Sequence, residues 1–324
     1  MKNDSPILSV KDLKTWFPIR RGVLARTVGY VRAVDGVSLD IDRGRTLGLV
    51  GESGCGKTTL GRTLIGLEPV RSGTVCFEGK DLAALDRTEV RRLRKRMQMI
   101  FQDTLSSLNP RMNVLDIVTE GLAAFQMLKK SRREHAEELM ADVGLDKDTI
   151  HRYPHEFSGG QRQRISIARA VSLKPDFIVC DEPVSSLDVS VQAQVMNLLM
   201  DLKERYALSY LFISHDLSVV SNISDQVAVM YLGKIMEFGD VEAVIGRPLH
   251  PYTRALVAAV PIPGIHRDRR RILHGETPSP ADPPSGCPFH TRCPEVMPVC
   301  ARIEPDMIRC SGRQVRCHLY APDS

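Results

Sequence analysis

A glycine-rich segment, set between an apolar run and a helical pattern, is the feature that most limits what this chain can fold into. Residues 51–59 read Gly-Glu-Ser-Gly-Cys-Gly-Lys-Thr-Thr and match the pattern G-x-x-x-x-G-K-[ST]. The run Thr46–Val50 predicts a buried strand before the segment, and Leu60–Leu67 predicts a helix after it. Glycines let backbone N–H groups form a nest for an anion, and the helix N-terminus adds its positive end. The segment therefore predicts a phosphate-binding loop rather than a turn that matches by chance.

The side chains of this loop have distinct predicted roles in binding a nucleotide. Lys57 should reach the β- and γ-phosphates, and the Thr58 hydroxyl should bind magnesium. Cys55 lies inside the nest, where amide dipoles should lower the pKa of its thiol, so we expect alkylation there to block ATP binding. The predicted nucleotide-binding residues of the loop are Gly51, Ser53, Gly54, Cys55, Gly56, Lys57, Thr58 and Thr59.

A second acidic motif follows another apolar strand pattern. Phe177–Cys180 is followed directly by Asp181 and Glu182. Two carboxylates in isolation could simply cap a strand end. In a chain with a phosphate-binding loop, Asp181 would hold magnesium through water, and Glu182 would act as general base toward the attacking water. Together the two motifs predict an ATPase.

The remainder of the chain up to about residue 252 alternates strand-like and helical patterns, which predicts an α/β sheet. Residues 111–152 turn helical, with amphipathic pieces at Leu122–Met127 and Glu137–Val143, and predict a helical subdomain inserted between two core strands. The basic run Arg91–Arg96 predicts a solvated helix face, with contact to the loops of a membrane partner or to lipid headgroups as the alternative. Further buried strands are predicted at Gln98–Phe101 and Tyr210–Ser214.

Nothing in the sequence indicates a membrane span or a secretory signal. No run of about 18 consecutive apolar residues occurs, and the N-terminus lacks an apolar middle region. The 44 Lys and Arg residues against 39 Asp and Glu give a net charge of +5, too small an excess to argue for nucleic acid or anionic lipid. We therefore expect a cytosolic chain that reaches a membrane only through partners, and whose eight cysteines are thiols or metal ligands.

Residues 157–164, Phe-Ser-Gly-Gly-Gln-Arg-Gln-Arg, resemble the LSGGQ signature of the ABC ATPases, with Phe157 in place of leucine. The helical pattern Gln161–Leu173 would direct its N-terminus and Ser158 at a γ-phosphate. In this family that phosphate belongs to the opposite subunit, so the resemblance implies a head-to-tail dimer that encloses two ATP molecules. The signature residues are Ser158, Gly159, Gly160 and Gln161.

Other positions match the landmarks of the same family in order. Gln102 resembles the glutamine that senses magnesium and the γ-phosphate, and Asp188 lies in a segment that resembles the D-loop between the two ATP sites. His215 resembles the switch histidine that contacts the γ-phosphate. Phe17 occupies the place of the aromatic residue that stacks on adenine, with Trp16 as the alternative. The resemblance covers residues 7 to about 246 and implies Glu182, His215, Lys57 and Gln102 as catalytic residues.

Three further segments resemble the ATPases of dipeptide and oligopeptide importers, and most of all the second, F-type ATPase of the dipeptide system: Asp103–Met112, Asp188–Gln194 and His250–Leu256. The resemblance implies a heterodimer with a related ATPase, two membrane permeases and a substrate-binding protein, with this subunit peripheral on the cytoplasmic face of the inner (plasma) membrane. Importers of nickel, glutathione and murein peptides share these motifs, so those solutes are alternatives. Further alternatives are an exporter subunit, an iron–sulfur sensor with the ABC fold, and a soluble ABC ATPase acting on nucleic acid. ABC ATPases of this last kind usually have a coiled-coil insertion or tandem ATPase halves, and neither is visible in this sequence.

The predicted fold is therefore an α/β P-loop ABC ATPase domain over residues 1–246, with the helical subdomain at about 111–165. Residues 247–324 form a small, loop-rich, cysteine-containing extension, because prolines interrupt regular structure there.

Four cysteines of the extension are separated by five, six and sixteen residues. A small segment with little apolar material commonly needs a metal or disulfide to order it. Zinc sites usually have closer C-x2–4-C pairs, and the wider spacing suits an iron–sulfur cluster at least as well. The family resemblance implies a 4Fe–4S cluster, with zinc or free thiols as alternatives; Cys310 matches no family position, and His290 and His318 are possible substitute ligands. The implied cluster ligands are Cys287, Cys293, Cys300 and Cys317.

Overall fold

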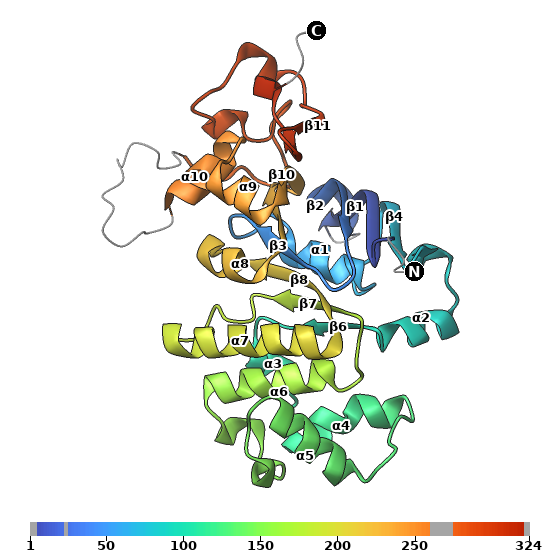
Figure 1. The fold of residues 1–324 in the computed structure, drawn as a ribbon. Coiled ribbons are helices and arrows are strands. Elements are labelled where there is room, and N and C mark those ends of the chain that lie inside the picture. Colours follow the sequence, from blue (N-terminus) through green and yellow to red (C-terminus); the bar gives the residue numbers. More distant parts are fainter. Residues whose placement is uncertain (1–4, 23–24, 260–274, 321–324) are drawn as a thin grey trace. The chain divides into compact units, whose positions relative to one another are not determined.

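The computed structural model describes residues 5–22, 25–259 and 275–320 (Figure 1), and the chain divides into two compact units. Unit 1 comprises Met1–Ile41, Thr46–Ala83 and Ile213–Ser324, and unit 2 comprises Asp42–Arg45 and Ala84–Phe212. The predicted N-terminal region and C-terminal extension include residues 1–4, 23–24, 260–274 and 321–324, which lie outside the described residues.

The first sheet of unit 1 is antiparallel and has the strand order β2-β1-β4-β5. Its two long strands form a hairpin in which Leu8 pairs with Ile41 and Phe17 pairs with Val31. Apolar side chains such as Leu8 and Leu13 are fully buried, while the outer ends of both strands carry exposed polar residues. The strands are β1 (Leu8–Arg21), β2 (Arg26–Ile41), β4 (Ser72–Phe77) and β5 (Lys80–Asp81).

The second group of strands in unit 1 has the order β11-β12-β10-β9-β3. Strand β3 is buried along its whole length and pairs in parallel with β9. Strand β10 pairs antiparallel with β9 and, through Glu237↔Val315, with β12. The last hairpin of the C-terminal extension therefore continues the sheet that carries the phosphate-binding loop. The strands are β3 (Thr46–Val50), β9 (Gln226–Tyr231), β10 (Lys234–Asp240), β11 (Met307–Cys310) and β12 (Arg313–Arg316).

Unit 2 contains short parallel strands and most of the helices. Strands β6 and β7 pair in parallel, and within this unit the strand order is β8-β7-β6, with β8 passing into unit 1 at Ile213. Residues of β7 are completely buried, as expected for a strand covered on both faces. Helices α4, α5 and α6 pack on one another, and α6 also packs on α7. The strands are β6 (Met97–Ile100), β7 (Phe177–Asp181) and β8 (Ser209–Ser214); the helices are α2 (Arg87–Arg94), α3 (Thr104–Ser107), α4 (Val114–Ala124), α5 (Arg132–Asp142), α6 (Gly159–Val171) and α7 (Val189–Tyr206).

The predicted strands agree with the structure to within one residue at each end, whereas the predicted helices are displaced. Helix α1 (Lys57–Leu64) begins three residues before the predicted Leu60, because Gly56 forms its N-terminal cap. Helix α4 ends before the predicted Met127, since Gln126 has a φ of +55° and leaves the helical conformation. Helix α5 begins five residues before Glu137, where Ser131 and Glu134 form a capping box.

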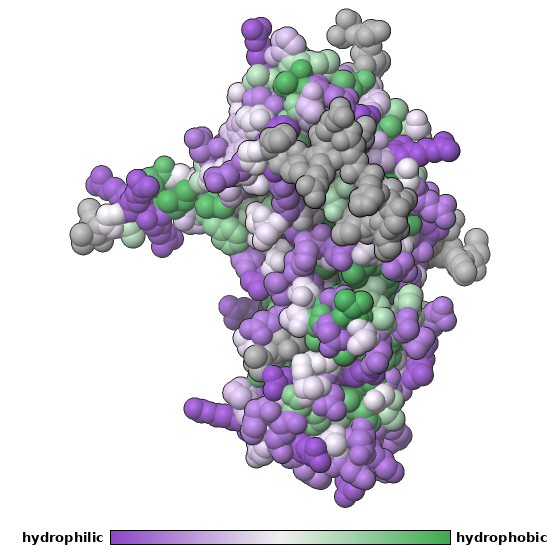
Figure 2. Space-filling model, turned by 90° about the vertical axis from the view of Figure 1, so that its left-hand side faces the viewer, coloured by the Kyte–Doolittle hydropathy of each residue, from purple (hydrophilic) through white to green (hydrophobic). Residues whose placement is uncertain are grey.

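The face drawn in Figure 2 is mostly hydrophilic, and its hydrophobic side chains form small separate patches. No helix in the described ranges combines the length and apolarity that crossing a bilayer requires.

The C-terminal extension begins with a buried capping arrangement at His250. The Nδ1 atom of His250 accepts a hydrogen bond from the backbone N–H of Tyr252 at 3.0 Å, at the start of α10 (Pro251–Ala259). The backbone N–H groups of Leu249 and His250 both donate to the carboxylate of Glu237 on β10 at 2.9 Å. Burial, together with the charge of Arg254, lowers the pKa of His250 to about 3, so the ring is neutral and can accept. A neutral imidazole therefore caps this helix beside the sheet.

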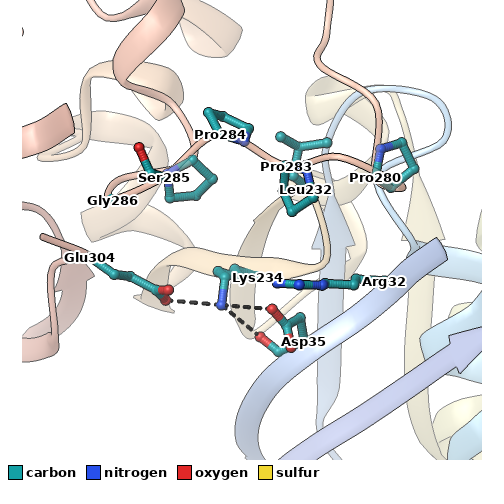
Figure 3. Close-up of a pocket in the computed structure, with 11 residues that line it drawn as sticks. Arg32, Asp35, Leu232, Lys234, Pro280, Pro283, Pro284, Ser285, Gly286 and Glu304 are labelled. Atoms are coloured by element: carbon teal, nitrogen blue, oxygen red, sulfur yellow. Dashed lines mark hydrogen bonds and ion pairs between the residues drawn. The ribbon is translucent and has the colours of Figure 1, made fainter. Parts of the chain in front are cut away.

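The same extension contacts strands β2 and β10 around a cavity of about 240 Å³ (Figure 3). Lys234 of β10 projects between Asp35 and Glu304, with its Nζ atom 3.1 Å and 2.9 Å from their carboxylate oxygens. The backbone N–H of Arg32 donates to the carbonyl of Pro280 at 3.0 Å. Since the lysine is shared by a carboxylate of β2 and one of the extension, this contact ties the extension to the first sheet.

The buried His250 predicts a pH-dependent stability. Its pKa is near 6.5 in an unfolded chain and about 3 when folded, so the unfolded state binds more protons between these values. Stability from the neutral ring is complete above pH 6.5 and is lost as the pH falls toward 3, by at most about 1.4 kcal/mol per pH unit. The control is His250→Asn, which keeps a capping oxygen without a titrating ring. We expect the thermal midpoint of the wild type to fall more steeply from pH 6.5 to pH 4 than that of the variant; parallel profiles would contradict this.

Candidate functional site

The phosphate-binding loop joins β3 to α1, the strand–loop–helix context that the sequence predicted. Gly56 has a φ of +107° and caps α1, and a Cβ atom at this position would lie 1.9 Å from the carbonyl oxygen of Ala33. Only glycine fits both constraints. Ser53 and Gly54 are exposed at the tip of the loop, while Cys55 and Lys57 are buried.

Lys57 contacts the loop's own backbone. Its Nζ atom donates to the carbonyl oxygens of Gly51 at 2.8 Å and Glu52 at 3.0 Å, and its side chain is almost fully buried. An ammonium group has three donors, so the loop carbonyls hold it at the anion-binding nest. To bind phosphate oxygens, Lys57 must exchange these carbonyls for the ligand.

The expectation of a reactive Cys55 thiol is wrong. The residue is 1% exposed, and its Sγ atom lies 2.8 Å from where a Cβ atom on Gly51 would be. Burial raises the pKa of this thiol and outweighs the nearby charge of Lys57 and the amide contacts. Cys55 therefore contributes to the loop through its backbone, and its thiol is too buried and too weakly acidic to be alkylated readily.

Glu52 is a charged residue of the loop for which the sequence pattern predicts no role. Its carboxylate receives two hydrogen bonds from Arg292, at 2.7 Å and 3.0 Å, and one from Thr277 at 2.8 Å. Its backbone N–H donates to the hydroxyl of Tyr252 at 2.9 Å. Tyr252 belongs to the segment His250–Leu256, which the sequence marked by resemblance only, and no local pattern marked Arg292.

Unit 1 also contains the candidate adenine-stacking and switch residues. The ring of Trp16 is covered by the guanidinium carbons of Arg32 and Arg71, at 4.9 Å and 4.5 Å from its centroid. Because these guanidinium groups cover the Trp16 ring, a base has less access to it. Phe17, the next residue of β1, is therefore the better candidate for stacking on adenine. His215 is exposed directly after β8.

In unit 2, the predicted general base and the predicted sensor glutamine are in contact. The Nε2 atom of Gln102 donates to Oε2 of Glu182 at 3.0 Å. Asp181 ends β7 and is 1% exposed, whereas Glu182 follows it with a φ of +45° and is half-buried. The carboxylate of Asp181 is therefore buried, while that of the next residue, Glu182, remains partly accessible.

The signature segment is built as the N-terminus of α6. Ser158 caps the helix, and its backbone N–H donates to Oε1 of Gln161 at 3.0 Å in a capping box. A Cβ atom on Gly160 would lie 2.4 Å from Cγ1 of Val191 in the first turn of α7. Asp188 caps that second helix by accepting from the backbone N–H of Val191 at 2.9 Å. The signature and the D-loop are thus two adjacent helix N-termini, both with exposed capping residues.

The structure gives no support to the predicted iron–sulfur cluster. In the described ranges no three His, Cys, Asp or Glu side chains converge to hold a metal ion. Burial raises the pKa of the Cys287 thiol to about 12 and of the Cys317 thiol to about 11, and the other thiols of the predicted set raise both further. These four thiols therefore lie near one another without converging on a single ion, whereas in a 4Fe–4S cluster each cysteine would bind a separate iron.

Comparison with known proteins adds two family matches. A model described as ABC transporter matches residues 34–185, and one described as Oligopeptide/dipeptide transporter, C-terminal region, matches residues 236–300. The second match includes both His250 and three of the four predicted cluster ligands, Cys287, Cys293 and Cys300.

Curated relatives resemble the chain along nearly its full length. The oligopeptide transport ATP-binding protein AppF of Bacillus subtilis is 51% identical over 98% of this chain and 99% of its own length. A putative peptide import ATP-binding protein of Brucella ovis is 52% identical over 94% of both chains.

Solved structures share the fold. CbiO1 from Clostridium perfringens, part of an ABC transporter complex, superposes with a TM-score of 0.63 at 24% identity over 75% of this chain and 92% of its own. The ATP-binding cassette MJ0796, a dimer bound to ADP and phosphate, gives the same TM-score and identity over 72% of this chain and 98% of its own.

The contact between Gly160 and Val191 predicts a compensating pair of substitutions. Gly160→Ala should destabilise unit 2 by about 1–3 kcal/mol, because the added methyl group overlaps the valine. Adding Val191→Ala removes the overlapping Cγ1 and should restore most of the loss, as read from the thermal midpoint of unfolding. A double variant no more stable than Gly160→Ala would contradict this packing.

Proposed function

Since the chain belongs to the family of ATP-binding subunits of oligopeptide and dipeptide ABC importers, we propose that hydrolysis depends on the contact between Gln102 and Glu182. The subunit is an ATPase that energises peptide import. Full-length similarity to AppF carries this assignment, because it includes both the ATPase domain and the extension.

The chemistry assigns one role to each charged residue of the site. Glu182 removes a proton from water as the water oxygen attacks the γ-phosphorus, and the bond between that phosphorus and the bridging oxygen of ADP breaks. Gln102 orients Glu182 through the 3.0 Å hydrogen bond. Lys57 and His215 stabilise the charge on the transferring phosphoryl group. Magnesium, which accompanies ATP as the substrate complex, would be held by Thr58, Gln102 and Asp181 and would neutralise phosphate charge.

Two cassettes are needed in this proposal, since the signature residues Ser158, Gly159, Gly160 and Gln161 would bind the ATP held by a second subunit. The exposed caps Ser158 and Asp188 suit such a role, because helix N-termini attract anions. We place Phe17 against adenine, and a related ATPase as the partner cassette. Two permeases, contacted near Gln102 and residues 112–150, and a substrate-binding protein complete the complex at the cytoplasmic face of the inner membrane.

Substitution of the general base tests the mechanism. Glu182→Gln should keep ATP binding and trap the closed dimer, with hydrolysis reduced by roughly a hundredfold or more because proton removal is lost. The matched control is Glu204→Gln, an exposed glutamate on α7, which should hydrolyse ATP at the wild-type rate. Wild-type turnover of Glu182→Gln would remove Glu182 from this role.

The assay uses the complex co-purified through this subunit, titrated with its binding protein and di- and oligopeptides. Clear ATPase without a peptide response would instead indicate nickel, glutathione or another solute.

A 4Fe–4S cluster on Cys287, Cys293, Cys300 and Cys317 is part of the same proposal. The chemistry of the set supports it: backbone N–H groups two residues further on donate to the sulfurs of Cys287, Cys293 and Cys317 and would stabilise thiolates. Iron would supply the positive charge that these buried thiols need to ionise, and the cluster would cross-link the extension.

The cluster is tested by colour and metal content. Anaerobically purified wild type should be brown, and Cys293→Ser should lose the colour along with its iron. Cys310→Ser, outside the ligand set, should remain brown. A colourless wild type with stoichiometric zinc would overturn the cluster.

A further inference from the structure

Glu52 places a negative charge in a loop that must bind a polyphosphate. The negative charge of Glu52 interacts with two other residues of the loop. It raises the pKa of the Cys55 thiol, and the positive charge of Lys57 helps to lower the pKa of Glu52 itself. The carboxylate therefore adds negative potential to a loop that binds an anion, and it opposes the binding of phosphate. Unless another group offsets this charge, it weakens ATP binding.

Arg292 of the extension supplies the offsetting charge. Its guanidinium binds both carboxylate oxygens of Glu52, a geometry that fits two planar groups. The Arg292 side chain is 6% exposed and that of Glu52 is 25% exposed, so water screens the pair little. Burial raises the pKa of Glu52, but the bonds from Arg292 and Thr277 outweigh it and the net pKa is lowered. The carboxylate thus stays ionised and paired.

Aromatic packing fixes the arginine at this position. Its Cζ atom lies 5.8 Å from the ring centroid of Tyr231, whose hydroxyl also accepts from the guanidinium at 3.3 Å. Tyr231 packs against Tyr252 and Phe289, with centroids 4.8 Å and 5.3 Å away. Tyr252 is fully buried and holds the backbone N–H of Glu52. The extension therefore binds both the carboxylate and the backbone N–H of Glu52.

We propose that Arg292 is a positioning residue for the ATPase: by neutralising Glu52 it leaves Lys57 and the loop amides available to the phosphates of ATP. A residue of the C-terminal extension thereby sets the affinity of the nucleotide site. The inference rests on the ATPase function above and adds a component from outside the ATPase motifs.

The test compares two variants that break the same ion pair from opposite sides, in the full-length chain, by direct ATP-binding measurements. Arg292→Gln leaves an uncompensated carboxylate and should weaken ATP binding roughly five- to thirtyfold, whereas Glu52→Gln should bind ATP at least as tightly as the wild type. The double variant should return to within about threefold of wild type, since both charges are gone. In the assembled complex, Arg292→Gln should raise KM for ATP more than it lowers kcat. Arg309→Gln, an exposed arginine of β11, is the matched control.

Three results would overturn the proposal. Equal weakening by Arg292→Gln and Glu52→Gln would mean that the ion pair acts only by holding the loop, and no recovery in the double variant would mean the same. Wild-type affinity in a folded Arg292→Gln would remove the residue from the site. Thermal unfolding shows whether each variant folds; if Arg292→Gln does not, Arg292→Lys, which keeps the charge, must bind ATP within about threefold of wild type. A wild type that does not bind ATP at all would overturn the ATPase function itself.

Discussion

The phosphate-binding loop needs backbone N–H groups turned toward an anion, and the rest of unit 1 is arranged around that requirement. Gly56 meets the carbonyl of Ala33, and the carbonyl of Cys55 accepts from the backbone N–H of Gly233 at 2.9 Å. The loop therefore packs closely against the middle of β2 and is held by the β9–β10 turn. Strand β10 in turn pairs with β12 and binds the start of α10 through Glu237. Loop, sheet and extension thus form one connected hydrogen-bonded framework.

The ATPase framework was readable from the sequence because its signals are local. A strand buried on both faces, such as β3 or β7, is a short uninterrupted apolar run, so its limits were predicted to within one residue. Helix ends were harder, since they depend on caps such as Gly56 and on single residues such as Gln126 that leave the helical conformation. The order of the motifs along the chain then identified the family, because each additional motif reduces the number of protein families that the sequence can match.

The other contacts of the site could not be predicted from the sequence, because they join residues far apart along the chain or depend on how deeply a side chain is buried. Arg292 and Glu52 are 240 positions apart, and no periodicity links them. The thiol of Cys55 sits among amide dipoles, which suggested a low pKa, yet desolvation prevails once the side chain is enclosed. The pairing of β10 with β12 was missed for a similar reason: four-residue strands among prolines carry little pattern of their own.

The sheet pairing of the extension also determines where this protein can be divided. A chain ended at the predicted limit of the ATPase domain, residue 246, would lose β12 and leave one side of β10 without its partner strand. An unpaired edge of this kind invites pairing with other chains and aggregation. The same cut would strip the buried Glu237 of the N–H groups of Leu249 and His250 and of the nearby Arg313. The C-terminal extension therefore belongs to the same folding unit as the sheet that carries the phosphate-binding loop.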